Sequence, residues 1–145
     1  MKVDLQINGQ KMAMISALIG SRIFKDYAMT ISSISNDLLG SYLFQLEWEI
    51  VNSSSVSISC NRDCVVIVAL WEHESRQDSL INSLQFDGWL LKNDQPIKGK
   101  KDEKYVAAKA VLSQIIQANR SLSFSKHENS LPISVFVFEG NVDYY

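Results

Sequence analysis

The chain has two cysteines, Cys60 and Cys64, and one of its two histidines, His73, follows them closely. Cysteine and histidine side chains are the usual protein ligands of zinc, and two cysteines close together can also form a disulfide. A structural zinc site needs four ligands, usually with tight Cys-x-x-Cys spacing, and only His127 remains elsewhere. We therefore expect no metal and no cofactor, and we interpret the pair as reduced and structural.

Residues 72–78 form the most polar segment beside these cysteines, with three carboxylates, a histidine and an arginine. A catalytic interpretation makes His73 a general base oriented by a neighbouring carboxylate, Glu72 or Glu74. The order of these residues matches no motif with a known mechanism. Contact with a partner is the preferred interpretation, because binding residues are often carried on loops at strand ends.

Length and composition limit the classes of protein to consider. A chain of 145 residues with 46% hydrophobic residues is expected to form a single domain, residues 1–145. The net charge of −2 supplies no general excess of lysine and arginine for binding nucleic acid. We find no signal peptide, and the longest apolar run, residues 64–71, is too short to span a membrane. A cytoplasmic protein is expected.

The first half of the chain is predicted to consist of strands. Asn8-Gly9 indicates a hairpin with a return strand over residues 11–16, although a helix over residues 11–24 is the rival interpretation. Alternating apolar residues predict a strand over 42–51. A second hairpin is expected around residues 61–63, with Cys60 and Cys64 facing each other, and residues 64–71 should form a central strand.

The second half contains the main predicted helix. Asp87-Gly88 indicates a tight hairpin, and a short helix capped by Asp78 could precede it. Asp102 is expected to cap a helix over residues 103–118, which Asn119 ends. The predicted apolar stripe of this helix consists of Tyr105, Ala108, Val111, Leu112, Ile115 and Ile116. Residues 133–138 are apolar on both faces and predict a final, central strand.

These elements predict an α+β fold, an antiparallel or mixed sheet of about five to seven strands with one main amphipathic helix packed across one face. Acidic segments near aromatic residues could then share a surface suited to a cationic protein. The candidate partner-binding residues are Glu47, Glu49, Trp71, Glu72, Glu74, Asp78, Glu139, Asp143, Tyr144 and Tyr145.

In general character, the chain resembles the immunity proteins of bacterial polymorphic toxin systems, including contact-dependent growth inhibition. No family motif matches residue by residue. The resemblance implies an inhibitor that binds a cognate, basic toxin domain, such as a nuclease, and covers its active site. Two alternatives remain, a small enzyme using His73 and neighbouring carboxylates, and a nucleic-acid-binding module. The second would use the lysine loop of Lys98, Lys100, Lys101 and Lys104.

Overall fold

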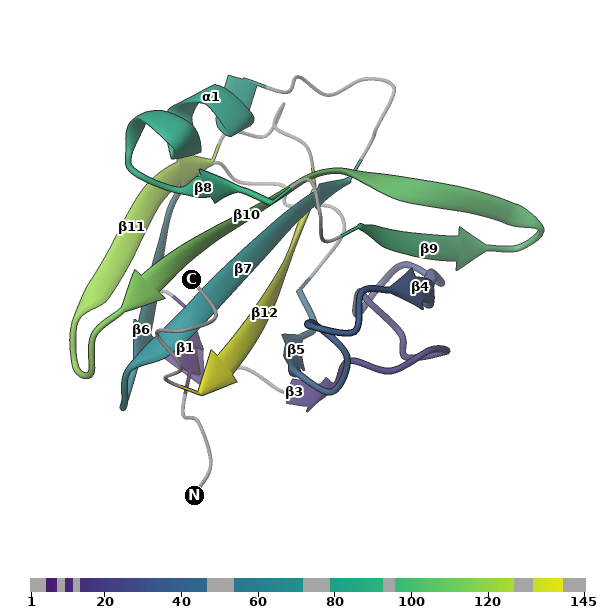
Figure 1. Ribbon diagram of the computed structural model, residues 1–145, viewed down its shortest axis with the longest axis horizontal. Coiled ribbons are helices and arrows are strands. Elements are labelled where there is room, and N and C mark those ends of the chain that lie inside the picture. The colour runs from purple at the N-terminus through teal and green to yellow at the C-terminus, as the bar shows by residue number, and fades with distance from the viewer. Residues whose placement is uncertain are drawn as a thin grey trace.

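The computed structural model describes residues 5–7, 10–11, 14–46, 54–71, 79–92, 96–126 and 132–139. Within these ranges the chain forms strands in two sheets and one short helix, α1 (Ser79–Phe86) (Figure 1). The predicted α+β fold was therefore wrong, because the segment expected to be the main helix is a strand. The fold is nearly all-β.

The large sheet is antiparallel, with the strand order β3-β5-β12-β7-β10-β9-β4. Its strands are β3 (Met14–Ser16), β4 (Thr30–Ile34), β5 (Tyr42–Phe44), β7 (Cys64–Trp71), β9 (Ile97–Lys101), β10 (Lys104–Ile116) and β12 (Ile133–Glu139). A short strand, β8 (Leu90–Leu91), pairs with β10 outside this order. As the sequence predicts, β7 and β12 are central strands, and every side chain of β7 is buried.

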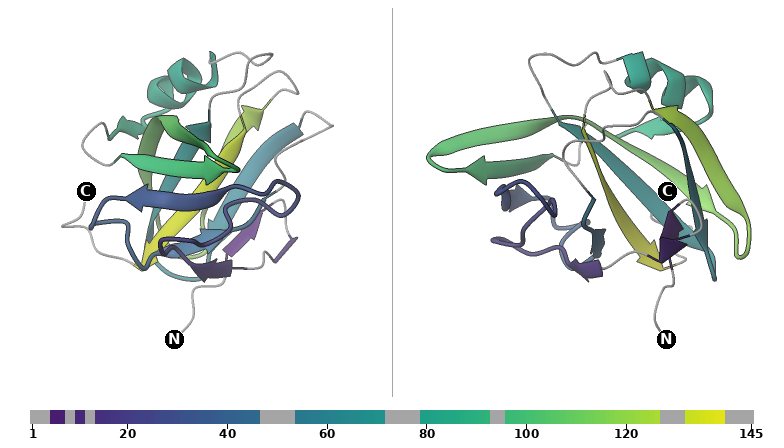
Figure 2. Two further views of the ribbon diagram at one scale, coloured as in Figure 1. Left: turned by 90° about the vertical axis from the view of Figure 1, so that its right-hand side faces the viewer. Right: turned by 180° about the vertical axis from the view of Figure 1, so that it is seen from behind.

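The small sheet has the order β11-β6-β1-β2. Its strands are β1 (Leu5–Ile7), β2 (Gln10–Lys11), β6 (Ser54–Cys60) and β11 (Ser121–Lys126). It lies beside one face of the large sheet, and α1 lies at one end of both (Figures 1 and 2). One core joins Ile58 of β6, Leu84 of α1 and the face of β7 that carries Val66 and Val68. The two sheets thus form a sandwich.

The opposite face of the large sheet covers a second core. Ile67 and Trp71 of β7 pack there with Phe24 and Met29, which come from the segment before β4. The sheet curls around this core, because isolated backbone bridges join Arg22 to Thr30 and Phe24 to Leu46. These bridges connect the edge strand β4 to the chain just beyond β5. Among the described residues, strands and loops therefore cover this second face.

Strand β10 is the segment predicted to be a helix. Its register against β7 shifts between Ala108 and Ala110, which makes Lys109 the extra residue of a β-bulge. Side chains of a regular strand alternate between faces, and the bulge moves this alternation by one residue. Ala108 and Val111 therefore face the same core although they are three residues apart. This spacing imitates the period of a helix.

The Asp87-Gly88 pair ends a helix and does not form the predicted hairpin. The backbone N–H of Trp89 donates to the carbonyl of Leu84 at 3.0 Å, and Gly88 has a φ of +94°. Glycine is favoured at this position after a helix because it has no Cβ to oppose the left-handed conformation. The predicted short helix before this pair is confirmed as α1, and its expected cap, Asp78, lies outside the described residues.

The N-terminal segment confirms the predicted pairing around residues 8–9, since β1 pairs antiparallel with β2. The return strand was expected over residues 11–16. Instead, β2 remains in the small sheet while β3 joins the large one. The rival helix over residues 11–24 was wrong, because this range holds β3 and the bridges at Arg22 and Phe24.

Gly99 lies where β9 passes close to Met29. A Cβ at residue 99 would lie 2.7 Å from Met29 Sδ, whose side chain is only 1% exposed. Gly99→Ala is therefore expected to lower the free energy of unfolding by about 1–3 kcal/mol, as measured by urea denaturation. In a Met29→Ala background the new Cβ has room, and the same change should cost little. An equal cost in both backgrounds would contradict this explanation.

Candidate functional site

Most residues of the predicted acidic surface lie outside the part of the chain that the structure describes. These are Glu47, Glu49, Glu72, Glu74, Asp78, Asp143, Tyr144 and Tyr145, together with His73 and His127. Glu139 is the last residue of β12, and its backbone pairs with Cys64. The structure describes the backbone of Glu139 but not its side chain. The proposed convergence of the acidic segments thus stays a prediction.

Trp71 was expected to be an aromatic anchor for a partner, but its side chain is fully buried. The indole Nε1–H donates a hydrogen bond to Ser134 Oγ on β12 at 3.0 Å. Its ring also meets the Phe24 ring edge-on, with the centroids 6.5 Å apart. Both contacts lie in the core inside the curled sheet. In this structure Trp71 stabilises the fold and offers no surface for a partner.

A different group of residues meets on the hairpin formed by β9 and β10, which extends away from the rest of the fold (Figure 1). Lys100 lies opposite Tyr105 in the hairpin, with its Nζ atom 5.2 Å from the centre of the tyrosine ring. Lys101 Nζ lies 4.5 Å from the centre of the Tyr27 ring. Both distances are within the range of a cation–π interaction.

The alternation of β9 explains why Lys98 and Lys100 face away from the core. Ile97 and Gly99 are buried, so the side chains of Lys98 and Lys100 point to the other face of the strand. The hairpin turns at Asp102, which has a φ of +55°. The prediction that Asp102 caps a helix was therefore wrong. Lys104 is exposed just after the turn.

The register places Lys98, Lys100 and Tyr105 on one face of the hairpin, and Lys101 and Lys104 on the other, where Lys101 meets Tyr27. We call these two faces together the lysine–tyrosine surface. Tyr105 is 67% exposed, a large fraction for an aromatic side chain. Asp102 and Glu103 at the turn partly offset the four lysine charges. The surface combines ammonium groups with aromatic rings, and such a combination can bind an anion that also has an apolar face.

The sequence identified the lysine loop, but neither tyrosine was assigned to it. Tyr105 was assigned to the stripe of a helix that does not exist, and Tyr27 lies far away in the sequence. Tyr27 reaches Lys101 because β4, which follows it, pairs with β9. The spacing of Lys100 and Tyr105 across the turn could have indicated a hairpin pair, but the Tyr27 contact had no local signal.

A second candidate site is the connection between β6 and β7, residues 60–64, which we call the cysteine corner. Both cysteines are buried and neither is in a disulfide, and their Sγ atoms lie 2.7 Å apart. The predicted hairpin was wrong, because β6 pairs with β1 and β11 while β7 pairs with β10 and β12. The corner therefore passes from one sheet to the other. The expected proximity of the cysteines holds for this different reason.

Hydrogen bonds hold the cysteine corner against the turn between β10 and β11. Asn119 N–H donates to the Cys60 carbonyl at 2.8 Å, and Ala118 N–H donates to Asp63 Oδ1 at 2.8 Å. A hydrogen bond with the Cys64 thiol is the main cause that lowers the pKa of Cys60 to about 7. Burial opposes this shift, and the charge of Arg62 supports it.

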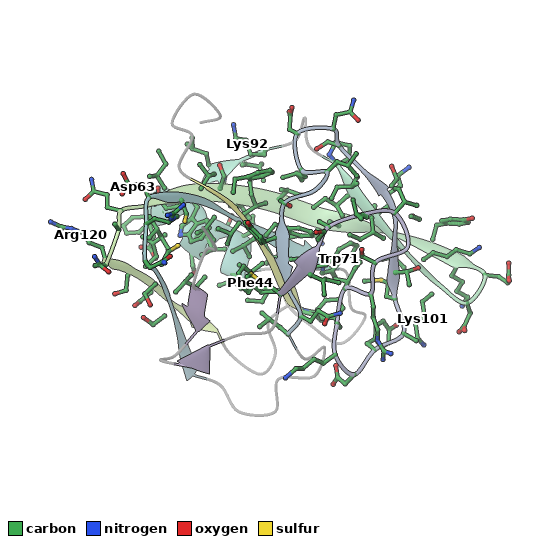
Figure 3. The ribbon with its side chains drawn as sticks, turned by 90° about the horizontal axis from the view of Figure 1, so that it is seen from below. Phe44, Asp63, Trp71, Lys92, Lys101 and Arg120 are labelled. Carbon is green, nitrogen blue, oxygen red and sulfur yellow. The ribbon has the colours of Figure 1, made fainter. Side chains whose placement is uncertain are left out.

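The turn between β10 and β11 also borders an open pocket of about 380 Å³. Its lining consists of Ile115, Ile116, Gln117, Arg120, Ser121 and Leu122. The lining is mainly aliphatic, and Arg120 supplies a cation. Figure 3 shows Arg120 and Lys101 near opposite ends of the molecule, so this pocket and the lysine–tyrosine surface are separate features.

Among the described residues, no group of three or more His, Cys, Asp or Glu side chains is placed to hold a metal ion. The described helix is too short to cross a membrane.

Comparisons with known proteins identify similar folds and no family. No protein-family model matches the sequence, and no curated protein matches it. A domain-sized part of a GH138 enzyme targeting pectin rhamnogalacturonan II is similar, with a TM-score of 0.63 and 14% identity. The match covers 97% of this chain and 16% of that enzyme.

A beta-glucuronidase from glycoside hydrolase family 2 is also similar, with a TM-score of 0.65 and 11% identity. This match covers 94% of the chain and 14% of the enzyme. At this identity both matches show the fold alone, and they lend no support to the immunity role expected from the sequence. The chain has the fold of a β-domain that forms a small part of two glycoside hydrolases.

Proposed function

We propose that this chain is a non-catalytic binding domain that contacts an acidic saccharide through the lysine–tyrosine surface. The observation that carries the proposal is the contact of two lysines with aromatic rings at the β9–β10 hairpin, Lys100 with Tyr105 on one face and Lys101 with Tyr27 on the other. The two similar enzymes act on carbohydrates, and the chain corresponds to about one-sixth or less of each. An accessory role is consistent with this small share.

The chemistry of the surface suits an acidic sugar. A sugar ring has an apolar face of C–H groups that can pack on the exposed ring of Tyr105, because aromatic side chains offer large apolar area. Lysine ammonium groups can donate charge-assisted hydrogen bonds to the carboxylates of uronic acids. A neutral saccharide would use only the first of these contacts. The proposal thus predicts preference for acidic over neutral sugars.

Single-stranded nucleic acid is a second candidate, because bases stack on aromatic rings beside cationic side chains. The tyrosines found at the lysine loop favour this candidate more than the sequence did. We favour the saccharide because both similar enzymes act on carbohydrates.

Titration calorimetry of the full chain at low salt tests the proposal. The probes are an oligogalacturonate, a neutral oligosaccharide of equal length and an oligothymidylate. Binding of the oligogalacturonate, with weak or no binding of the other two, is the expected result. Tighter binding of the oligothymidylate would replace the saccharide with nucleic acid as the ligand. Failure of all three to bind would overturn both candidates.

Tyr105→Ala is expected to weaken binding of the oligogalacturonate by about five-fold, from loss of roughly 1 kcal/mol of ring contact. Tyr105→Phe retains the ring and should bind almost as well as the wild type. Phe86 is the matched control, because it is 92% exposed and belongs to α1 rather than the hairpin. Equal effects of Tyr105→Ala and Phe86→Ala in the same titration would argue against a specific role for Tyr105.

A further inference from the structure

We propose that Cys60 and Cys64 form a reversible disulfide that cross-links the two sheets at the cysteine corner. The oxidant is a disulfide of low molecular weight, such as glutathione disulfide. This inference is independent of the proposed binding function. Since the chain has only two cysteines, any disulfide within one molecule must join this pair.

The geometry places the sulfur atoms ready to react. Their separation of 2.7 Å exceeds the length of a disulfide bond, about 2.05 Å, by less than one ångström. The β10–β11 turn holds the connection at two points, where Asn119 N–H donates to the Cys60 carbonyl and Ala118 N–H donates to the Asp63 carboxylate. Bond formation therefore requires small side-chain movements while the ends of β6 and β7 stay in place.

The two thiols differ in ways that suggest separate roles. Both side chains are buried, but Cys60 keeps 3% of its surface exposed and Cys64 keeps none, so Cys60 is the thiol that an external reagent can contact. The pKa of Cys60, lowered to about 7 mainly by the hydrogen bond with Cys64, provides thiolate at neutral pH. A thiolate is the nucleophile in thiol–disulfide exchange. Cys60 is thus the attacking residue, and Cys64 is the resolving residue.

The exchange proceeds in two balanced steps. The Cys60 thiolate attacks one sulfur of glutathione disulfide, which forms a mixed disulfide and releases one glutathione thiolate. Cys64 then loses its proton and attacks Cys60 Sγ, which forms the intramolecular bond and releases the second glutathione. The protein pair loses two electrons and glutathione disulfide gains them. The released thiolates take up the two protons.

The new bond would join strands that belong to different sheets. Cys60 ends β6 of the small sheet and Cys64 begins β7 of the large sheet, and both side chains lie in the core between the sheets. A cross-link restricts the unfolded chain and so stabilises the folded one. We therefore expect the oxidised protein to unfold at a higher temperature than the reduced protein.

The test incubates the native, reduced chain with glutathione disulfide and then measures intact mass and free thiols after denaturation. The expected product has lost two hydrogen atoms, has no free thiol and carries no glutathione. Dithiothreitol should restore the original mass and the lower unfolding temperature. Retention of both thiols, or accumulation of a stable glutathione adduct on the wild type, would overturn the proposal.

Single variants test the separate roles. Cys64→Ser should stop at the mixed disulfide and retain one glutathione on Cys60. Cys60→Ser should react much more slowly, because Cys64 is fully buried. Equal reaction rates of the two variants, with both shown to be folded by circular dichroism, would refute the assignment of roles. The wild-type measurement does not depend on whether either variant folds.

Discussion

Trp71→Ala is expected to lower the free energy of unfolding by about 3–5 kcal/mol. The indole is fully buried in the core inside the curled sheet, where it contacts Phe24 and donates a hydrogen bond to Ser134 Oγ. Alanine would leave a cavity and remove the donor to Ser134. Because small domains are stable by only about 5–15 kcal/mol, the loss is a large fraction of the total.

Urea denaturation of the wild type and two variants measures this effect. Trp71→Phe should give an intermediate loss, since phenylalanine fills much of the cavity but donates no hydrogen bond to Ser134. Phe86→Ala is the control, because Phe86 is 92% exposed and should change stability by no more than about 0.5 kcal/mol. If Trp71→Ala proved as mild as Phe86→Ala, Trp71 would be at the surface, as the sequence suggested.

Lys100→Glu/Lys101→Glu is expected to weaken binding of an oligogalacturonate at least about 100-fold at low salt. Each reversal replaces an attractive charge with a repulsive one, and a hydrogen bond to a charged group contributes about 1.5–3 kcal/mol. The tyrosine contacts of both lysines are lost as well. Titration calorimetry compares the double variant with the wild type under the same conditions.

Lys92→Glu/Arg120→Glu is the matched control, since it makes the same change in net charge away from the hairpin (Figure 3). It should retain most of the binding. Circular dichroism of both double variants checks that they are folded. If both lost binding to the same degree, the interaction would depend on overall charge rather than on the lysine–tyrosine surface, and the proposed function would be wrong.

Several strands could be predicted because their local pattern left one interpretation. Residues 64–71 and 133–138 are apolar on both faces and form the central strands β7 and β12. The pairing around Asn8-Gly9 was also predictable from a tight-turn sequence. In these segments the structure that the local sequence pattern favours is also the one adopted in the folded sheet.

Strand β10 shows how a single residue can mislead a prediction from periodicity. The bulge at Lys109 places Ala108 and Val111 on one face, and three-residue spacing is a property of helices. Asp87-Gly88 misled in the same way, since a glycine with positive φ serves hairpins and helix ends alike. Neither ambiguity can be resolved without the neighbouring strands.

By itself, the sequence determined the buried strands, because their residues are apolar on both faces. It placed Cys60 and Cys64 close together through a hairpin that the structure does not contain. Only the tertiary structure decided that β6 and β7 belong to different sheets and that Tyr27 reaches Lys101. Pairing between distant strands makes these choices, and alternation along one strand is compatible with many partners. For this reason the lysines were predictable as a cationic loop, whereas the aromatic rings beside them required the fold.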